Sequence, residues 1–106
     1  MKAIDLANNV AATAGDQASV NVGKVTPFLP NRMVQAHFQT EGAAGGSPEY
    51  AIDGSMDDTT WVADIGTTTA LGHSVVEVPA YPYMRLSITT AASTAGTISA
   101  WLEGNG

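Results

Sequence analysis

The sequence predicts an all-β protein, specifically an antiparallel β-sandwich of jelly-roll or immunoglobulin-like type. Short runs of alternating apolar and polar residues recur along the chain, and clusters of Gly, Pro, Asn and Asp separate them. No stretch of a dozen residues carries an apolar stripe with helical spacing; residues 3–14 come closest, and Asn8 and Asn9 interrupt them. At 106 residues the chain has the size of one domain. We divide it into an N-terminal arm or first strand at residues 1–17 and a sandwich domain at residues 18–106.

The predicted strands follow one another at short intervals. Residues 3–7 and 19–23 are the first candidates. Residues 33–40 alternate most regularly, because Val34 and Phe38 fall on one face and polar residues fall on the other. Further strands are predicted at residues 49–53, 60–65, 73–78, 84–89 and 98–103.

The last two predicted strands, residues 84–89 and 98–103, read as an antiparallel hairpin around a loop of very small residues. Each alternates strictly and therefore has one buried face. The apolar faces together predict a core made of Val20, Val22, Val34, Phe38, Ile52, Val76, Val78, Leu86, Ile88, Ile98 and Leu102.

An acidic cluster at Asp53, Asp57 and Asp58 has two interpretations. Its carboxylates offer oxygen ligands of the kind that Ca²⁺ prefers, although the spacing is not that of an EF-hand. Asp and Gly are also the usual residues of turns, and Asp53–Gly54 would then set the bend between two strands. We favour the turn.

The sequence offers no convincing catalytic or metal motif. His37 and His73 read as surface histidines, because a zinc site needs more ligands than two histidines supply and the chain has no Cys. A Gly-x-Ser-x-Gly elbow is absent, and Gly23–Lys24 lacks the rest of a phosphate-binding loop. We therefore predict no catalytic residue, no cofactor, no metal and no enzymatic activity.

The charge pattern argues against nucleic-acid and membrane partners. The formal net charge is −6, and the four cations, Lys2, Lys24, Arg32 and Arg85, are scattered. A nucleic-acid or anionic-membrane surface requires clustered cations. No apolar run approaches the length of about 20 residues that spans a bilayer, and the first ten residues lack the apolar region of a signal peptide.

The aromatic residues divide into core and surface candidates. Phe38, Tyr50 and Trp61 lie on apolar strand faces and are expected in the core. Trp101 lies on the face opposite the apolar residues of its strand. It is therefore a candidate protein contact or sugar-stacking platform, unless its strand is covered on both faces. Residues 26–32 combine apolar residues, prolines and Arg in a loop that either docks on a partner or caps the sandwich.

Residues 81–104, "YPYMRLSITTAASTAGTISAWLEG", and residues 1–23 resemble small tailed-bacteriophage virion proteins of the head-decoration (cement) type. Residues 33–72 carry no such resemblance. The resemblance implies a structural protein of the virion, assembled in the host cytoplasm. It would decorate or cement the capsid by binding major capsid or other virion subunits, as a homo-oligomer, most often a trimer.

From these observations we predict that the following residues contact partners: Lys2, Ile4, Leu6, Phe28, Leu29, Arg32 and Trp101. The N-terminal arm would be least needed for the core, so deletion of residues 1–10 should leave the fold intact and weaken attachment. The alternative function is a carbohydrate-binding or receptor-binding module of a tail fibre or baseplate. Its stacking platform would be Trp101 or Trp61 together with Tyr81 and Tyr83.

Overall fold

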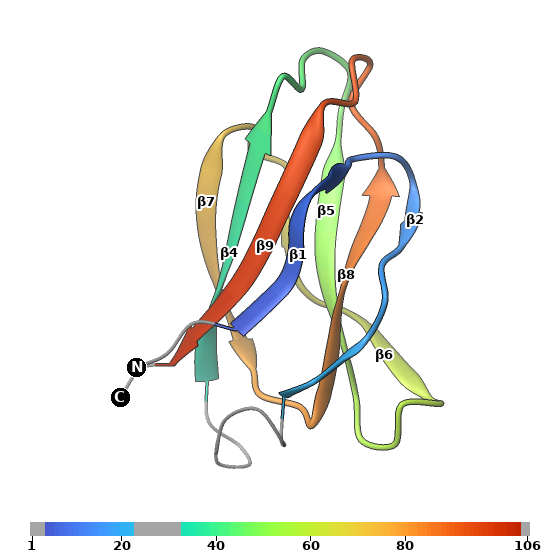
Figure 1. The fold of residues 1–106 in the computed structure, drawn as a ribbon, viewed down its shortest axis with the longest axis vertical. Helices are drawn as coiled ribbons and strands as arrows, with labels where there is room; N and C mark the ends of the chain where they lie inside the picture. The colour runs from blue at the N-terminus through green and yellow to red at the C-terminus, as the bar shows by residue number, and fades with distance from the viewer. Residues whose placement is uncertain (1–3, 23–32, 105–106) are drawn as a thin grey trace.

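The computed structural model describes residues 4–22 and 33–104 as two antiparallel sheets packed face to face (Figure 1). The strands are β1 (Ile4–Ala11), β2 (Gly15–Asp16), β3 (Val20–Asn21), β4 (Met33–Glu41), β5 (Glu49–Ser55), β6 (Trp61–Thr68), β7 (His73–Pro79), β8 (Tyr83–Thr90) and β9 (Thr97–Gly104). One sheet has the order β1-β9-β4-β7; the other has the order β2-β8-β5-β6, and β3 also pairs with β8. The predicted all-β sandwich is confirmed. Within the described ranges, no helix is long and apolar enough to cross a bilayer.

The core lies between the two sheets and consists of the inward-facing residues of the strands. Of the predicted core residues, Val20 and Val76 are partly buried against the core, and the others are fully buried. Phe38 and Tyr50 are the largest fully buried side chains, as expected. The Tyr50 hydroxyl has no hydrogen-bond partner among the described residues, and its burial raises the pKa of the phenol.

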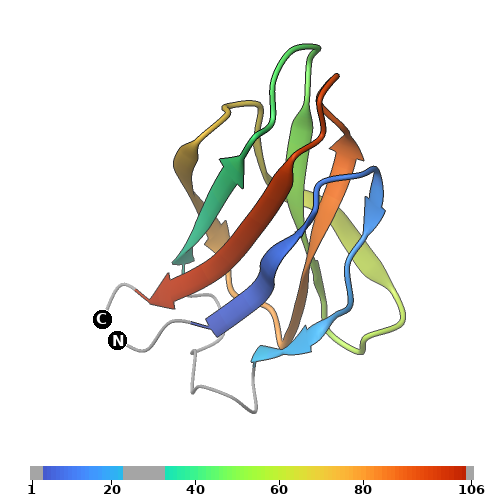
Figure 2. The same ribbon diagram turned by 45° about the horizontal axis from the view of Figure 1, so that its top comes forward.

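The prediction that the last two strands, β8 and β9, form a hairpin is wrong. β8 pairs with β5, whereas β9 pairs with β1 and β4 in the other sheet. The chain passes from the end of β8 over one end of the sandwich to β9 (Figures 1 and 2). Alternation reports which face of a strand is buried and carries no information about which strand it pairs with. The small-residue loop therefore bridges two sheets, and Ala44↔Thr94 links it to the loop after β4.

Residues 4–11 form an edge strand of the domain itself. β1 pairs with β9 from Ile4↔Leu102 to Ala11↔Thr97. Ile4, Leu6 and Ala7 are buried in the core. The expectation that this segment is least needed for the core is therefore wrong, because its removal would expose the apolar faces of β9 and β8.

The acidic cluster forms a turn, as we favoured, but at a different position. Asp53 and Gly54 belong to β5, and the bend follows at residues 56–60. Asp57 Oδ1 accepts hydrogen bonds from the backbone N–H groups of Thr59 and Thr60 at 2.9 and 2.8 Å. This is an Asx-type turn, in which a side chain caps neighbouring backbone donors.

Candidate binding face on the four-stranded sheet

The outer face of the four-stranded sheet gathers aromatic and polar side chains from strands far apart in the sequence. In the register, His37 of β4 lies opposite Trp101 of β9 and opposite Val75 of β7. Gln39 lies opposite His73 in the same way. Directly opposed residues in an antiparallel pair project from the same face and touch. Strand pairing therefore places His37 beside Trp101 and His73 on the same face of the sheet, one strand further away.

We call one group of four side chains on this face the Trp–His cluster: Trp101, His37, His73 and Glu103. The Nδ1 atom of His37 and the Nε2 atom of His73 are 3.0 Å apart, so one donates a hydrogen bond to the other. Trp101 lies nearly parallel to both rings, at 9° to His37 and 6° to His73, with centroids 5.0 and 5.8 Å away. The indole is thereby held in an offset stack against the histidine pair.

Glu103 closes the Trp–His cluster on its other side. The indole Nε1–H of Trp101 donates to Glu103 Oε1 at 3.3 Å. The second carboxylate oxygen lies 3.8 Å from His37 Nε2, a buried nitrogen with no hydrogen-bond partner among the described residues. The cluster fixes the position of the indole through one hydrogen bond and two ring contacts, so Trp101 is pre-oriented.

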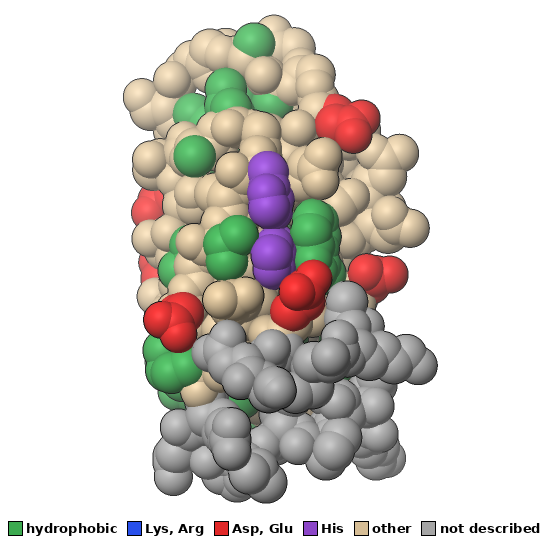
Figure 3. Space-filling view, turned by 90° about the vertical axis from the view of Figure 1, so that its left-hand side faces the viewer, with side chains coloured by type: hydrophobic (Ala, Val, Ile, Leu, Met, Phe, Trp, Pro, Cys, Tyr) green, Lys and Arg blue, Asp and Glu red, His purple; other side chains and the backbone are tan. Residues whose placement is uncertain are grey.

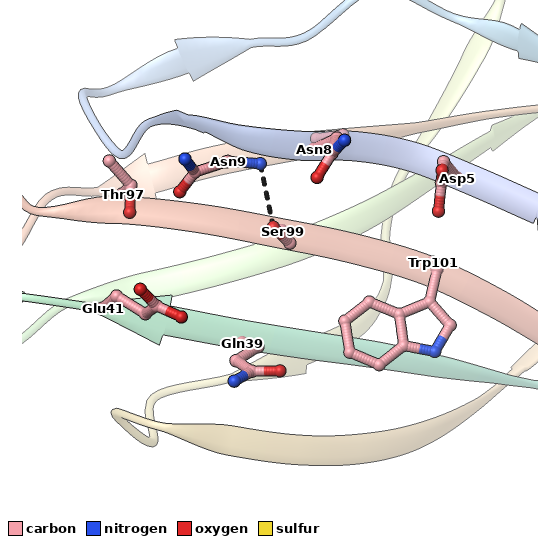
Figure 4. A pocket seen from close by; sticks show the side chains of 9 residues that line it. Asp5, Asn8, Asn9, Gln39, Glu41, Thr97, Ser99 and Trp101 are labelled. Carbon is pink, nitrogen blue, oxygen red and sulfur yellow. Dashed lines mark hydrogen bonds between the residues drawn. The ribbon is translucent and has the colours of Figure 1, made fainter.

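A groove of about 200 Å³ runs beside the indole, and we call it the polar groove. Apart from Ala7 and Trp101, its lining side chains are polar: Asp5, Asn8, Asn9, Gln39, Glu41, Thr97 and Ser99. Figure 4 shows these side chains projecting from β1, β9 and β4, with the broad side of the indole turned toward the viewer. The groove therefore combines one flat apolar surface with a rim of hydrogen-bonding groups.

An irregular β1 shapes one wall of the polar groove. The pairing of β1 with β9 shifts register between Asp5 and Ala7 and again before Val10. Asn9 has a φ of 53°, a value that Asn tolerates better than most residues. Its backbone N–H donates to Ser99 Oγ at 2.8 Å. Bulges of this kind redirect side chains, and here both Asn8 and Asn9 are exposed at the groove.

This face is acidic. Asp5 and Glu41 line the polar groove, and Glu103 lies in the neighbouring Trp–His cluster. Arg85, the one cation in the described ranges, lies in the five-stranded sheet and is paired with Asp53 and Asp16. Figure 3 shows the two histidines side by side, with hydrophobic and acidic side chains around them and no Lys or Arg in the described part of this view.

The predicted partner-binding residues do not come together in the described structure. Trp101 is on the outward face of β9, as its position in the alternating pattern indicated, and it is half-buried. Ile4 and Leu6 are buried in the core of this chain. The remaining residues of the prediction, Lys2, Phe28, Leu29 and Arg32, lie outside the described residues.

The aromatic residues suggested as partners of the tryptophans are placed elsewhere. Trp61, expected in the core, is half-buried on β6, and the guanidinium carbon of Arg85 lies 4.1 Å from its ring centroid. Tyr81 packs against the core so close to Gly54 that a Cβ there would come within 2.4 Å of its ring. Tyr83 belongs to β8 in the five-stranded sheet. Trp101 therefore has the two histidines, not the tyrosines, as its neighbours.

The polar residues of the groove carried no distinct sequence signal. In the sequence, Asn8 and Asn9 only weaken a helical pattern, and Gln39 and Ser99 look like ordinary outward positions of strands. In the described ranges, no three His, Asp or Glu side chains converge in a way that would hold a metal ion. The chemistry available at this face is ring stacking and hydrogen bonding.

Comparison with protein-family models finds no match, and the search of curated proteins finds no relative of this chain.

Proposed function

We propose that the chain is a structural protein of a tailed-bacteriophage virion that decorates or cements the capsid by binding major capsid or other virion subunits. The resemblance of residues 81–104 and 1–23 to small head-decoration proteins supports this proposal, and the β-sandwich agrees with it. The structural observation that supports this proposal independently of the resemblance is the regular, partly apolar sheet edge formed by β7 and the turn before it.

β7 differs from the other edge strands. β1 has two register shifts and β6 has one, while β2 and β3 are two residues long. β7 pairs with β4 without a shift from Met33↔Pro79 to Gln39↔His73 and is the last strand of its sheet. Bulges and short strands protect a sheet edge from neighbours, whereas a regular edge favours contact with them.

Apolar side chains are exposed along this edge. Val75 of β7 is 45% exposed and Leu71, in the turn before β7, is 42% exposed. Val75 lies beside His37 on the outer face of the sheet. An exposed apolar group next to a regular edge is suited to packing against another subunit. We therefore place the virion contact on the β7 side, not on Ile4 and Leu6.

We further propose that the chain forms a homo-oligomer, a trimer as in the proteins that it resembles. Cyclic symmetry buries identical patches without leaving an open edge. Several contacts per oligomer would also strengthen attachment to a repetitive shell. Light scattering on the purified chain tests this proposal: a trimer is expected at high micromolar concentration, and a monomer there would contradict it.

Attachment is tested on purified virions and on particles that lack the chain. We expect a stoichiometric copy number on the virions and rebinding of purified chain to the depleted particles. The Val75→Ser variant should rebind at least about fivefold more weakly, as expected for loss of a buried apolar contact. Val62→Ser is the matched control, because Val62 is 47% exposed and lies in the other sheet. Absence of the chain from virions would refute the proposal.

Trp101 and the polar groove favour a second candidate function, a carbohydrate-binding or receptor-binding module of a tail fibre or baseplate. Immunogold labelling of virions with an antibody to the chain separates the two candidates. Label over the whole capsid supports decoration, whereas label confined to the tail supports the module.

A further inference from the structure

We propose that the polar groove and the adjacent face of Trp101 form a binding site for a neutral saccharide and hold a single sugar unit of it. This inference builds on the groove that favours the second candidate function and does not depend on capsid decoration. A chain that attaches to capsids but binds no sugar would refute this inference alone.

The first requirement of such a site is a flat apolar surface held in place. One face of a pyranose ring carries C–H groups, and these pack on an aromatic ring while the hydroxyl groups point outward. The Trp101 indole is fixed by its stack against His37 and His73 and by its hydrogen bond to Glu103. A ring already held in position loses little conformational entropy on binding.

The second requirement is a rim that both donates and accepts hydrogen bonds. Sugar hydroxyls do both, so amide side chains, which carry a donor and an acceptor together, match them best. Asn8 from β1 and Gln39 from β4 lie on opposite sides of the groove (Figure 4). Asp5 and Glu41 add acceptors, and Ser99 adds a hydroxyl in the floor. A groove rimmed in this way matches a polyhydroxylated ligand better than an apolar peptide segment.

The size and the charge of the groove restrict the class of ligand that it can bind. A groove of about 200 Å³ is smaller than the roughly 300–1,000 Å³ that drug-sized ligands occupy, which fits a single sugar unit. The carboxylates of Asp5, Glu41 and Glu103 would repel uronic acids, sialic acids and sulfated sugars. In the described structure no cation lines the groove to offset that repulsion. Neutral hexoses and N-acetylhexosamines are the class that remains.

The test begins with a glycan array that displays neutral and acidic saccharides, followed by titration with the free neutral saccharides that bind. Trp61→Phe leaves Trp101 as the sole tryptophan, so its fluorescence reports directly on stacking. We expect emission to change on titration, with a Kd on the order of 1 mM for a single sugar unit. The reciprocal Trp101→Phe variant retains Trp61, whose emission should not respond.

Two amide variants on one strand provide the matched comparison. Gln39 lines the groove, whereas Gln35 projects from the same face of β4 four residues away and does not line it. Gln39→Ala should weaken binding about fivefold, the loss expected for one hydrogen bond, and Gln35→Ala should not. Trp101→Ala should abolish binding.

Melting temperatures of all variants show whether each has folded, and the Gln39 and Gln35 pair remains informative if Trp101→Ala has not. Absence of binding to any neutral saccharide would overturn the inference. So would binding to acidic saccharides only, full binding by a folded Trp101→Ala variant, or equal binding by the two glutamine variants.

Discussion

Arg85 and Asp53 lie directly opposite each other on β8 and β5, and Arg85 Nε donates a hydrogen bond to Asp53 Oδ2 at 3.1 Å. The other oxygen of the Asp53 carboxylate accepts from the backbone N–H of Asp64 at 3.0 Å. The guanidinium also reaches Asp16 and stacks over Trp61. The Asp53 side chain is only 4% exposed, so these partners offset the free-energy cost of burying its carboxylate.

Removal of the cation should therefore destabilise the domain. Arg85→Met leaves the buried Asp53 carboxylate without a counter-charge, and we expect a loss of about 3 kcal/mol in the free energy of unfolding. Urea unfolding followed by circular dichroism measures it, with an unchanged m-value as the check on two-state behaviour. Asp16→Ala is the control: Asp16 is half exposed, and its loss should cost no more than about 1 kcal/mol. Equal losses would contradict this account.

Two glycines that both have a positive φ should respond differently to substitution by Ala. Gly72 has a φ of +85° and nothing near the position of a Cβ, so Gly72→Ala should cost about 1 kcal/mol for the left-handed conformation alone. Gly96 has a φ of +67°, and a Cβ there would lie 2.3 Å from the carbonyl oxygen of Glu41. Gly96→Ala must shift backbone as well and should cost at least about 3 kcal/mol. Thermal unfolding of the two variants measures the difference, and equal melting temperatures would show that the backbone around Gly96 yields easily.

The sequence predicted most of the strands and their buried faces, because alternation is a local property of each strand; the exceptions are β2, which was not predicted, and β6, whose expected buried face is half-buried or exposed. Strand pairing is not local. The contact of β1 with β9 joins Ile4 to Leu102, and no pattern within either segment specifies it. The Trp–His cluster follows from the same kind of pairing, since His37 meets His73 and Trp101 only through the register of β4 with β7 and β9. The outward position of Trp101 was predictable, whereas its neighbours were not.

Substitution and deletion in β1 test whether this strand is part of the core. Leu6 is 6% exposed, and Leu6→Ala should lower the free energy of unfolding by about 2–3 kcal/mol. Deletion of residues 1–10 removes most of β1 and should abolish cooperative thermal unfolding, whereas deletion of residues 1–3 should not. Thermal unfolding followed by circular dichroism compares the full chain with the two deletion variants. If the longer deletion still unfolds cooperatively near the original temperature, β1 is dispensable for the fold.

The turn at Asp57 should contribute to stability in a pH-dependent way. Hydrogen bonds from the backbone N–H groups of Thr60 and Thr59 lower the pKa of the Asp57 carboxyl below its ordinary value of 3.8. The folded protein therefore binds fewer protons at this site than the unfolded chain. The ionised Asp57 carboxylate therefore adds to the free energy of unfolding in full above pH 3.8. This stabilisation is lost as the pH falls below 3.8 and then passes the lower pKa that the carboxyl has in the folded state.

Asp57→Asn keeps an oxygen acceptor for both N–H groups but removes the charge, so the variant should be less stable than the wild type at neutral pH. This difference should shrink as the pH falls below 3.8, because the wild-type carboxyl then also becomes neutral. Effects of pH that the two proteins share cancel in the difference. Asp58→Asn is the control, since its backbone N–H, and not its carboxylate, bonds to Ser55 in the turn. Urea unfolding at a series of pH values measures the difference for each variant. A difference that stays constant or grows toward low pH would mean that the charge of Asp57 does not stabilise the turn.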